Sequence, residues 1–189
     1  MKQIKLLLGL ILIVLPTIVF SQGFTAPAEG NAAVYFVRIT KWGRENSFEY
    51  FHNSEFIGRA KGKNYMCFEY PAGEHLFWIS NESKSFVKCN LKAGKTYIVL
   101  VNVFMGAWKY DATLEPIIAK DKDFQRIKNF VLSEKSSVTS QYTIDKITTS
   151  LNKTNFIGDI MDKYQNKWKG TDKVKIITDD MFIPQDQLK

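Results

Sequence analysis

The feature that most constrains the fold is a pair of strand-like runs, residues 65–70 and 74–79, on either side of a Pro-Ala-Gly break. Both runs are rich in aromatic residues, which is typical of strands. Pro71 fixes its own φ and lacks a backbone donor, whereas Gly73 can take the positive φ that reverses a chain. The pattern predicts a hairpin with Pro71 and Gly73 in its turn, and residues 32–103 are expected to form further strands around it.

Further strands are predicted on both sides of this hairpin. Residues 32–39 are too continuously apolar for a strand with one wet face, so we expect a central strand that ends near Arg38. Other strand-like runs occupy residues 47–52, 55–57, 85–91 and 96–104. Asn53-Ser54 suits a two-residue hairpin turn between the first two of them. Six to seven short strands with frequent turns indicate an antiparallel sandwich or an open barrel, and we take the sandwich.

The spacing of apolar residues becomes helical after Trp108. Two stripes at helical spacing follow, one of Phe124, Ile127, Phe130 and Val131, the other of Ile144, Ile147, Leu151, Ile157, Ile160, Tyr164 and Trp168. Residues 174–183 form a short apolar segment that is either a strand or an extended strip on the body. The predicted fold class is mainly β with an α C-terminal region (α+β): an antiparallel β-sandwich of six to seven strands followed by two or three helices.

Four segments are predicted along the chain. They are a signal peptide at 1–21, a leader at 22–31, a β-sandwich domain at 32–119 and a helical C-terminal region at 120–189. The second helical stripe is too apolar to face water, so the helical region is expected to pack on the sandwich or on a second copy.

The first residues are typical of a secretory signal. Lys2 and Lys5 precede an apolar run at 6–20, and Ser21 supplies a small residue before Gln22. The run is shorter than the roughly twenty apolar residues that span a membrane. We therefore expect export to the periplasm or the extracellular space with cleavage after about Ser21; a retained anchor is the alternative.

The formal net charge of +7 is modest and uneven. Residues 120–175 are more basic than the predicted sandwich domain. This basic excess is explained either by solubility or, more specifically, by weak contact with an anionic membrane surface. A monomer and a homodimer both remain open.

Two cysteines in an exported chain raise the question of a disulfide. Cys89 is in phase with inward-facing residues of its strand, whereas Cys67 lies off the more apolar face of its own. A bridge needs Cα atoms within about 7 Å, and strands separated by a third strand lie about 9–10 Å apart. The pairing of Cys67 with Cys89 is left open.

Four sequence elements together resemble a known bacterial family: Ala33-Val34-Tyr35-x-x-Arg38, Phe56-Ile57-Gly58, Pro71-x-Gly73-x-His75 and Ala93-Gly94-Lys95-Thr96-Tyr97. Over about residues 31–108 the chain resembles the secreted and lipoprotein family known as domain of unknown function 2846, and it is similar in pattern to the PEGA-type β modules of cell envelopes. The resemblance implies a β module and an envelope address, and no activity. Asn53-Ser54 replaces the usual Asp-Gly turn of that family, and the helical region lies outside the match.

The two histidines are the main candidates for chemistry. Zinc sites need three or four ligands, and Glu74 points to the opposite strand face from its neighbour His75. We therefore expect His75 to bond to backbone near the start of its strand and His52 to be structural. The chain carries no triad order, nucleophile elbow or phosphate-binding loop. No catalytic residue, metal site or cofactor is predicted.

Three further residues are candidates for binding. Trp42 and Trp108 fall in expected loops beside glycines, where an exposed indole can contact a sugar or a partner protein. Arg38 ends a buried strand, so we expect an ion pair with a carboxylate such as Glu69 or Glu49, with ligand binding as the alternative.

The sequence therefore favours an exported, non-enzymatic β-sandwich module that binds another envelope protein or glycan, with no nucleic-acid partner. The rival hypothesis is a small metal-dependent or hydrolytic enzyme that uses His75 with Glu69 or Glu74. A third is a structural envelope protein whose basic helices lie on anionic lipid.

Overall fold

The computed structural model of the protein describes residues 22–106 and 110–189, so the predicted signal peptide and Trp108 lie outside the described residues. This part of the chain forms an α+β fold, mainly β with three C-terminal α-helices, which confirms the predicted class. The strands are β1 (Asn31–Arg38), β2 (Ser47–His52), β3 (Glu55–Lys61), β4 (Asn64–Pro71), β5 (Gly73–Ser80), β6 (Lys84–Leu91), β7 (Thr96–Met105), β8 (Tyr110–Ile117) and β9 (Val174–Ile177). The helices are α1 (Phe124–Ser133), α2 (Gln141–Lys153) and α3 (Phe156–Lys163), which a π-helical turn (Tyr164–Trp168) extends; a short 3-10 helix (Gln185–Gln187) follows β9.

The strands form two facing sheets. One has the order β4-β1-β7-β8 and the other has the order β3-β2-β5-β6-β9. Neighbouring strands are antiparallel except for β1 with β7 and β6 with β9, which run parallel. The sheets are therefore mixed, and the described chain has nine strands where the sequence predicted six to seven antiparallel ones.

The predicted hairpin at Pro71 and Gly73 is wrong, although the chain does turn there. β4 pairs with β1 in the four-stranded sheet, whereas β5 lies between β2 and β6 in the five-stranded sheet. The Pro-Ala-Gly segment is a corner through which the chain crosses from one sheet to the other. Gly73 takes φ +130° there, and the backbone N–H of Ala72 donates to Gly30 O over 3.1 Å. Pro and Gly mark a reversal of the chain, and they carry no information on which strand becomes the hydrogen-bonded partner.

We expect Gly73→Val to destabilise the protein by about 1–3 kcal/mol, because a β-branched residue is strained at a positive φ. The space around Gly73 is open, so the loss would come from the backbone and not from a clash. Urea unfolding measures it, and Ala72→Val in the same exposed corner is the matched control. Equal stability of the two variants would contradict the role given to Gly73.

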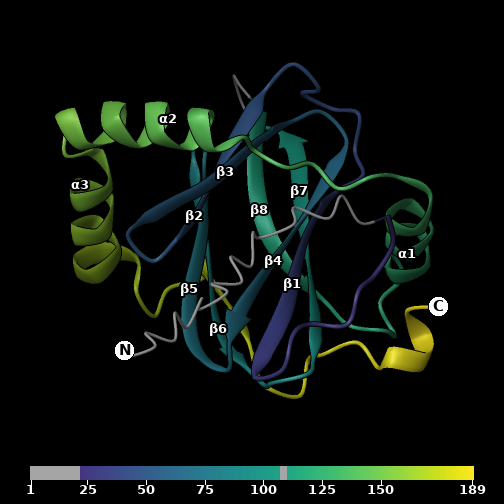
Figure 1. The fold of residues 1–189 in the computed structure, drawn as a ribbon. Helices are drawn as coiled ribbons and strands as arrows, with labels where there is room; N and C mark the ends of the chain where they lie inside the picture. The colour runs from purple at the N-terminus through teal and green to yellow at the C-terminus, as the bar shows by residue number, and fades with distance from the viewer. Residues whose placement is uncertain (1–21, 107–109) are drawn as a thin grey trace, which may run out of the picture.

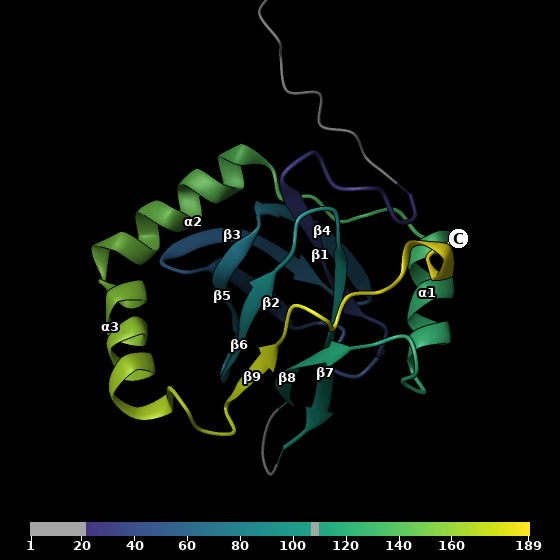
Figure 2. The same cartoon turned by 90° about the horizontal axis from the view of Figure 1, so that it is seen from below.

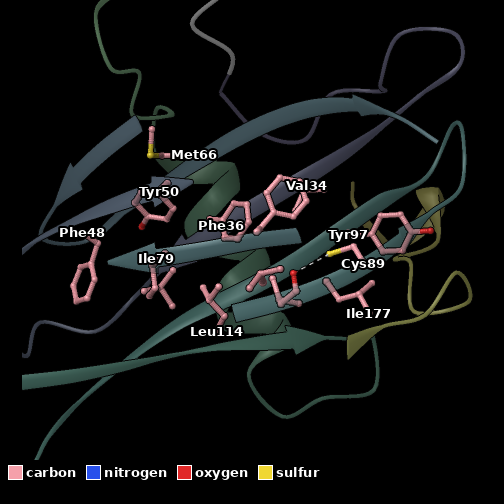
Figure 3. Packing of buried hydrophobic residues seen from close by; sticks show 14 of the residues in the cluster. Val34, Phe36, Phe48, Tyr50, Met66, Ile79, Cys89, Tyr97, Leu114 and Ile177 are labelled. Carbon is pink, nitrogen blue, oxygen red and sulfur yellow. Dashed lines mark hydrogen bonds between the residues drawn. The ribbon is translucent and has the colours of Figure 1, made fainter. Parts of the chain in front are cut away.

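The core lies between the two sheets. Phe36 of β1 meets Tyr50 of β2 and Phe77 of β5, with ring centroids 5.7 and 5.5 Å apart. Figure 3 shows Phe36 beside Tyr50 in this core, with Cys89 and Ile177 near Tyr97. β1 is buried along almost its whole length because its sheet is covered on both faces, as its continuous apolar run predicted.

The helices cover both outer faces of the sandwich (Figures 1 and 2). On the four-stranded sheet, Ile127 and Val131 of α1 pack with residues such as Tyr35 and Ile98. On the five-stranded sheet, all seven residues of the second helical stripe join a cluster with Phe51, Trp78 and Phe86. The stripe therefore has its apolar partner within the same chain. No helix of the described residues is long and apolar enough to span a membrane.

Cys67 and Cys89 do not form the disulfide that the sequence left open, because both thiols are free. Cys67 packs on the outer face of the four-stranded sheet, whereas Cys89 lies in the core between the sheets. Burial raises the pKa of the Cys67 thiol to about 11 and raises the pKa of Cys89 further. Both thiols are thus held in the protonated form, which is the less reactive one.

Candidate functional site

A cleft of about 800 Å³ opens between the five-stranded sheet and residues 161–172, which we call the C-terminal arm. One wall is the outer face of β5, β6 and β9; the other is the end of α3, the π-helical turn and the loop to β9. The residues that line it are Asn53, Glu74, His75, Leu76, Lys88, Met161, Tyr164, Gln165, Lys169, Gly170, Thr171, Asp172, Val174, Lys175 and Ile176. We refer to this feature as the cleft.

The π-helical turn shapes the far wall of the cleft. The N–H of Lys169 donates to Tyr164 O over 2.8 Å, which closes the wide turn. The rings of Tyr164 and Trp168 both reach Phe86 on the sheet, with centroids 5.1 and 5.4 Å away. Such turns are frequent at functional sites. Here the turn anchors the C-terminal arm to the sheet through Phe86, and the cleft opens beside it.

The interior of the cleft is apolar and its rim is charged. Leu76 is buried on the sheet, whereas Ile176 of β9 keeps 62% of its surface exposed. On the rim, Lys88 and Glu74 form an exposed ion pair of 3.0 Å. Exposed pairs of this kind contribute about 0–1 kcal/mol, so this one can open at little cost. The arrangement suits a ligand with apolar groups for the interior and polar groups for the rim.

The two histidines meet at the lip of the cleft. His52 Nε2 lies 2.9 Å from His75 Nδ1, and His75 Nε2 lies 2.8 Å from Pro71 O. Since a carbonyl only accepts, His75 Nε2 donates to Pro71. Asn53 Oδ1 accepts from the N–H of Leu76. The amide nitrogen of Asn53 therefore faces His52, with 3.1 Å between Asn53 Nδ2 and His52 Nε2. His75 therefore bonds to backbone as predicted, while its contact with His52 was not predicted.

Burial, and next the neighbouring His75, lower the pKa of His52, and Glu55 opposes them. The unfolded chain then takes up a proton near pH 6.5 before the folded chain does. His52 thus stabilises the fold fully above about pH 6.5, and this contribution is lost as the pH falls through the depressed pKa. We expect His52→Gln to flatten the fall in melting temperature between pH 7.5 and 5. An identical pH profile in the variant would contradict this prediction.

The rival enzymatic hypothesis needs a carboxylate beside His75. Glu74 pairs with Lys88, and Glu69 Oε2 accepts the N–H of Ala28 over 2.9 Å. Neither bonds to His75. Among the residues that the structure describes, no group of three His, Cys, Asp or Glu side chains is placed to hold a metal ion.

The ion pair predicted for Arg38 is wrong within the described chain. Arg38 is fully buried, and its two terminal nitrogens donate to backbone carbonyls of Trp42, Gly43 and Asn46 over 2.8, 2.7 and 3.0 Å. The guanidinium also lies over the ring of Phe48, 4.9 Å from its centroid. Burial lowers the pKa of Arg38, and Tyr50 opposes the shift. Arg38 is thus not a surface ligand; it holds the loop that carries Trp42.

Trp42 lies in a loop, as predicted, and 66% of its surface is accessible. It lines a hollow of about 440 Å³ with Ile39, Thr40, Lys41, Lys63 and Arg126. This hollow is at the opposite end of the sandwich from His75. β5 runs from Gly73 beside the cleft to Ser80, and Ser80 pairs with Glu49 near the start of β2, which directly follows the loop with Trp42.

Most cleft residues could not be predicted as a site. Ile176 reaches the cleft only because β9 joins β6. The sequence predicted Tyr164 only as an apolar residue of the second helical stripe. One signal was available for the contact between the two histidines. His52 is the last residue of β2 and His75 is near the first residue of β5, and these ends lie together when the two strands pair antiparallel.

No protein-family model and no curated protein matches the chain. The resemblance to domain of unknown function 2846 therefore stays a prediction from the sequence.

Proposed function

We propose that the protein is a non-enzymatic binding module of the cell envelope that holds a segment of a partner protein in the cleft. The cleft is the observation that carries this proposal, because its apolar interior and charged rim lie between two walls fixed by the core. Its volume of about 800 Å³ is in the range of ligand-binding sites, roughly 300–1,000 Å³. The predicted signal peptide supports the envelope address.

A protein segment suits the cleft better than a glycan. Glycans are recognised by exposed aromatic faces and hydrogen bonds, whereas the exposed group here is the aliphatic Ile176, beside Met161 and Val174. Aliphatic and Met-rich surfaces bind peptide side chains. The rim offers both signs of charge, with Lys88, Lys169 and Lys175 beside Glu74 and Asp172, which can fix the register of a bound segment.

The test places a photo-crosslinking residue at position 176 in living cells and, as a matched control, at position 142. Tyr142 is at least as accessible as Ile176, with 74% of its surface exposed, but it lies on α2 and does not line the cleft. We expect a discrete protein product at 176 that is absent at 142 and is lost when Lys88 and Lys175 are replaced by Glu. Identical products at both positions would remove the assignment of the cleft.

The alternative function is a metal-dependent or hydrolytic enzyme built on His75. The contact between His75 and His52 is the observation in its favour. Metal analysis of the purified protein separates the two functions. Stoichiometric zinc that disappears in His75→Ala would overturn the binding module, and a metal-free protein that still crosslinks at position 176 supports it.

A further inference from the structure

The end of the sandwich opposite the cleft carries a group of exposed apolar side chains. Trp42 of the β1–β2 loop is 66% exposed, and Phe104 and Met105 at the end of β7 are 41% and 63% exposed. β1 and β7 are parallel, so their carboxyl ends meet at one edge (Figure 1). A Cβ at Gly43 would lie 3.1 Å from the ring of Tyr110, which pairs with Met105, so loop and strand tip are in contact. We call this region the loop end.

The loop end is held in place from inside the protein. The buried Arg38 bonds to carbonyls of Trp42, Gly43 and Asn46, which fixes three points of the loop backbone. A loop that is already ordered loses little conformational entropy when it binds. The fold thus uses a buried charge to hold an exposed indole at the surface.

Basic side chains line the hollow on one side of the loop end. Lys41, Lys63 and Arg126 line the hollow beside Trp42, and no carboxylate lines it. Within the described chain, Arg126 is paired with Asp123, while Lys41 and Lys63 are in no ion pair. The hollow is therefore positively charged, while the acidic Glu45 of the same loop is paired with Arg44 and Lys61. The formal net charge of the whole chain is +7.

We propose that the loop end docks on an anionic lipid bilayer. Trp42, Phe104 and Met105 enter the headgroup region, and Lys41, Lys63 and Arg126 face the lipid phosphates. Aromatic and apolar side chains with a basic rim are the combination that binds the membrane interface. A glycan would use the indole and leave Met105 and Phe104 without a role. A rigid protein interface is depleted in lysine, which is abundant here.

The test measures co-sedimentation of residues 22–189 with vesicles of phosphatidylserine and phosphatidylcholine, and with vesicles of phosphatidylcholine alone. This chain is used because both sheets and all three hydrophobic clusters lie within it, and because the apolar run 6–20 would bind lipid by itself. We expect binding to the anionic vesicles that weakens as salt rises. Lys41→Ala and Lys63→Ala should each weaken it about fivefold, which corresponds to roughly 1 kcal/mol per cation. Trp42→Ala should weaken it about tenfold or more.

The surface of α2 provides a matched control, since an exposed Tyr142 lies there in a hollow with Lys146 and Lys153. Tyr142→Ala and the pair Lys146→Ala, Lys153→Ala should leave vesicle binding unchanged. Three results would overturn the proposal: no binding to anionic vesicles, loss of binding only in the α2 variants, or binding of a soluble anionic polysaccharide at Trp42 without vesicle binding. All substituted positions are exposed, so the variants should fold.

Discussion

A chain that ends at Ala119 is expected to form large aggregates where the chain through Lys189 stays dispersed. The truncation removes α1 from the four-stranded sheet and α2 and α3 from the five-stranded sheet. Residues such as Phe51, Trp78 and Phe86 would then face water. Burial of each large apolar side chain contributes about 1.5–3 kcal/mol, and apolar patches of this size drive association. Loss of β9 also opens the edge of β6, a template for strand pairing between chains.

Light scattering and a thermal melt of both chains, each beginning at residue 22, measure this effect. A chain ending at Lys169 is the intermediate control, because it keeps the three helices and lacks β9. We expect it to aggregate less than the shorter chain. A shorter chain that is monomeric and as stable as the full one would make the helices an independent appendage. The function would then more naturally lie in the helices.

Replacement of Arg38 by Met is expected to lower the free energy of unfolding by about 2–4 kcal/mol. Methionine has a similar length and no donor, so three backbone carbonyls lose a charged hydrogen-bond partner at once. Hydrogen bonds to charged groups contribute about 1.5–3 kcal/mol each, and part of this is recovered where the exposed loop reaches water. Arg38→Lys should recover only part of the loss, since a single ammonium cannot reproduce the forked geometry of guanidinium.

Arg59→Met is the matched control, because Arg59 is an exposed residue of β3 and the change should stay within about 0.5 kcal/mol. Hydrogen exchange of the 40–46 backbone amides separates a local effect from a global one. We expect faster exchange there in the Arg38 variant even under conditions where the protein is folded. Unfolding curves that coincide for the two variants would show that the buried guanidinium does not stabilise the loop.

Sequence patterns identified most of the elements and did not identify their partners. The continuous apolar run of β1 required two covered faces, and the helical stripe ending at Trp168 required an apolar surface. Both are local properties of the chain. The choice between a hairpin and a crossing at Gly73 depends on β1, which pairs with β4, and on β2, which pairs with β5; both strands lie well before the turn in sequence. β8 was missed because its exposed face is polar and Pro116 weakens its strand pattern, which an edge strand tolerates.

The difference between local patterns and contacts of distant segments applies to the candidate sites as well. Trp42 was predicted to lie in a loop because the surrounding residues are polar and include Gly43, and an exposed indole there was one of the alternatives. The partner of Arg38 was mispredicted, because a buried guanidinium needs acceptors of any kind and backbone carbonyls of a nearby loop leave no trace in the sequence. The cleft requires β9 beside β6, a pairing across more than eighty residues, for which a short segment offers no pattern.

Residues 174–183 bond to both sheets, which has a consequence for when folding can finish. β9 adds to β6 in one sheet, and the N–H of Ile183 donates to Thr96 O in the other over 2.8 Å. Chains are synthesised from the N-terminus, and pairings between distant segments form late. We therefore expect the nascent chain to stay incompletely folded until residues 174–183 have emerged. Such a delay would keep the chain open to export factors, as the signal predicted at residues 1–21 would require.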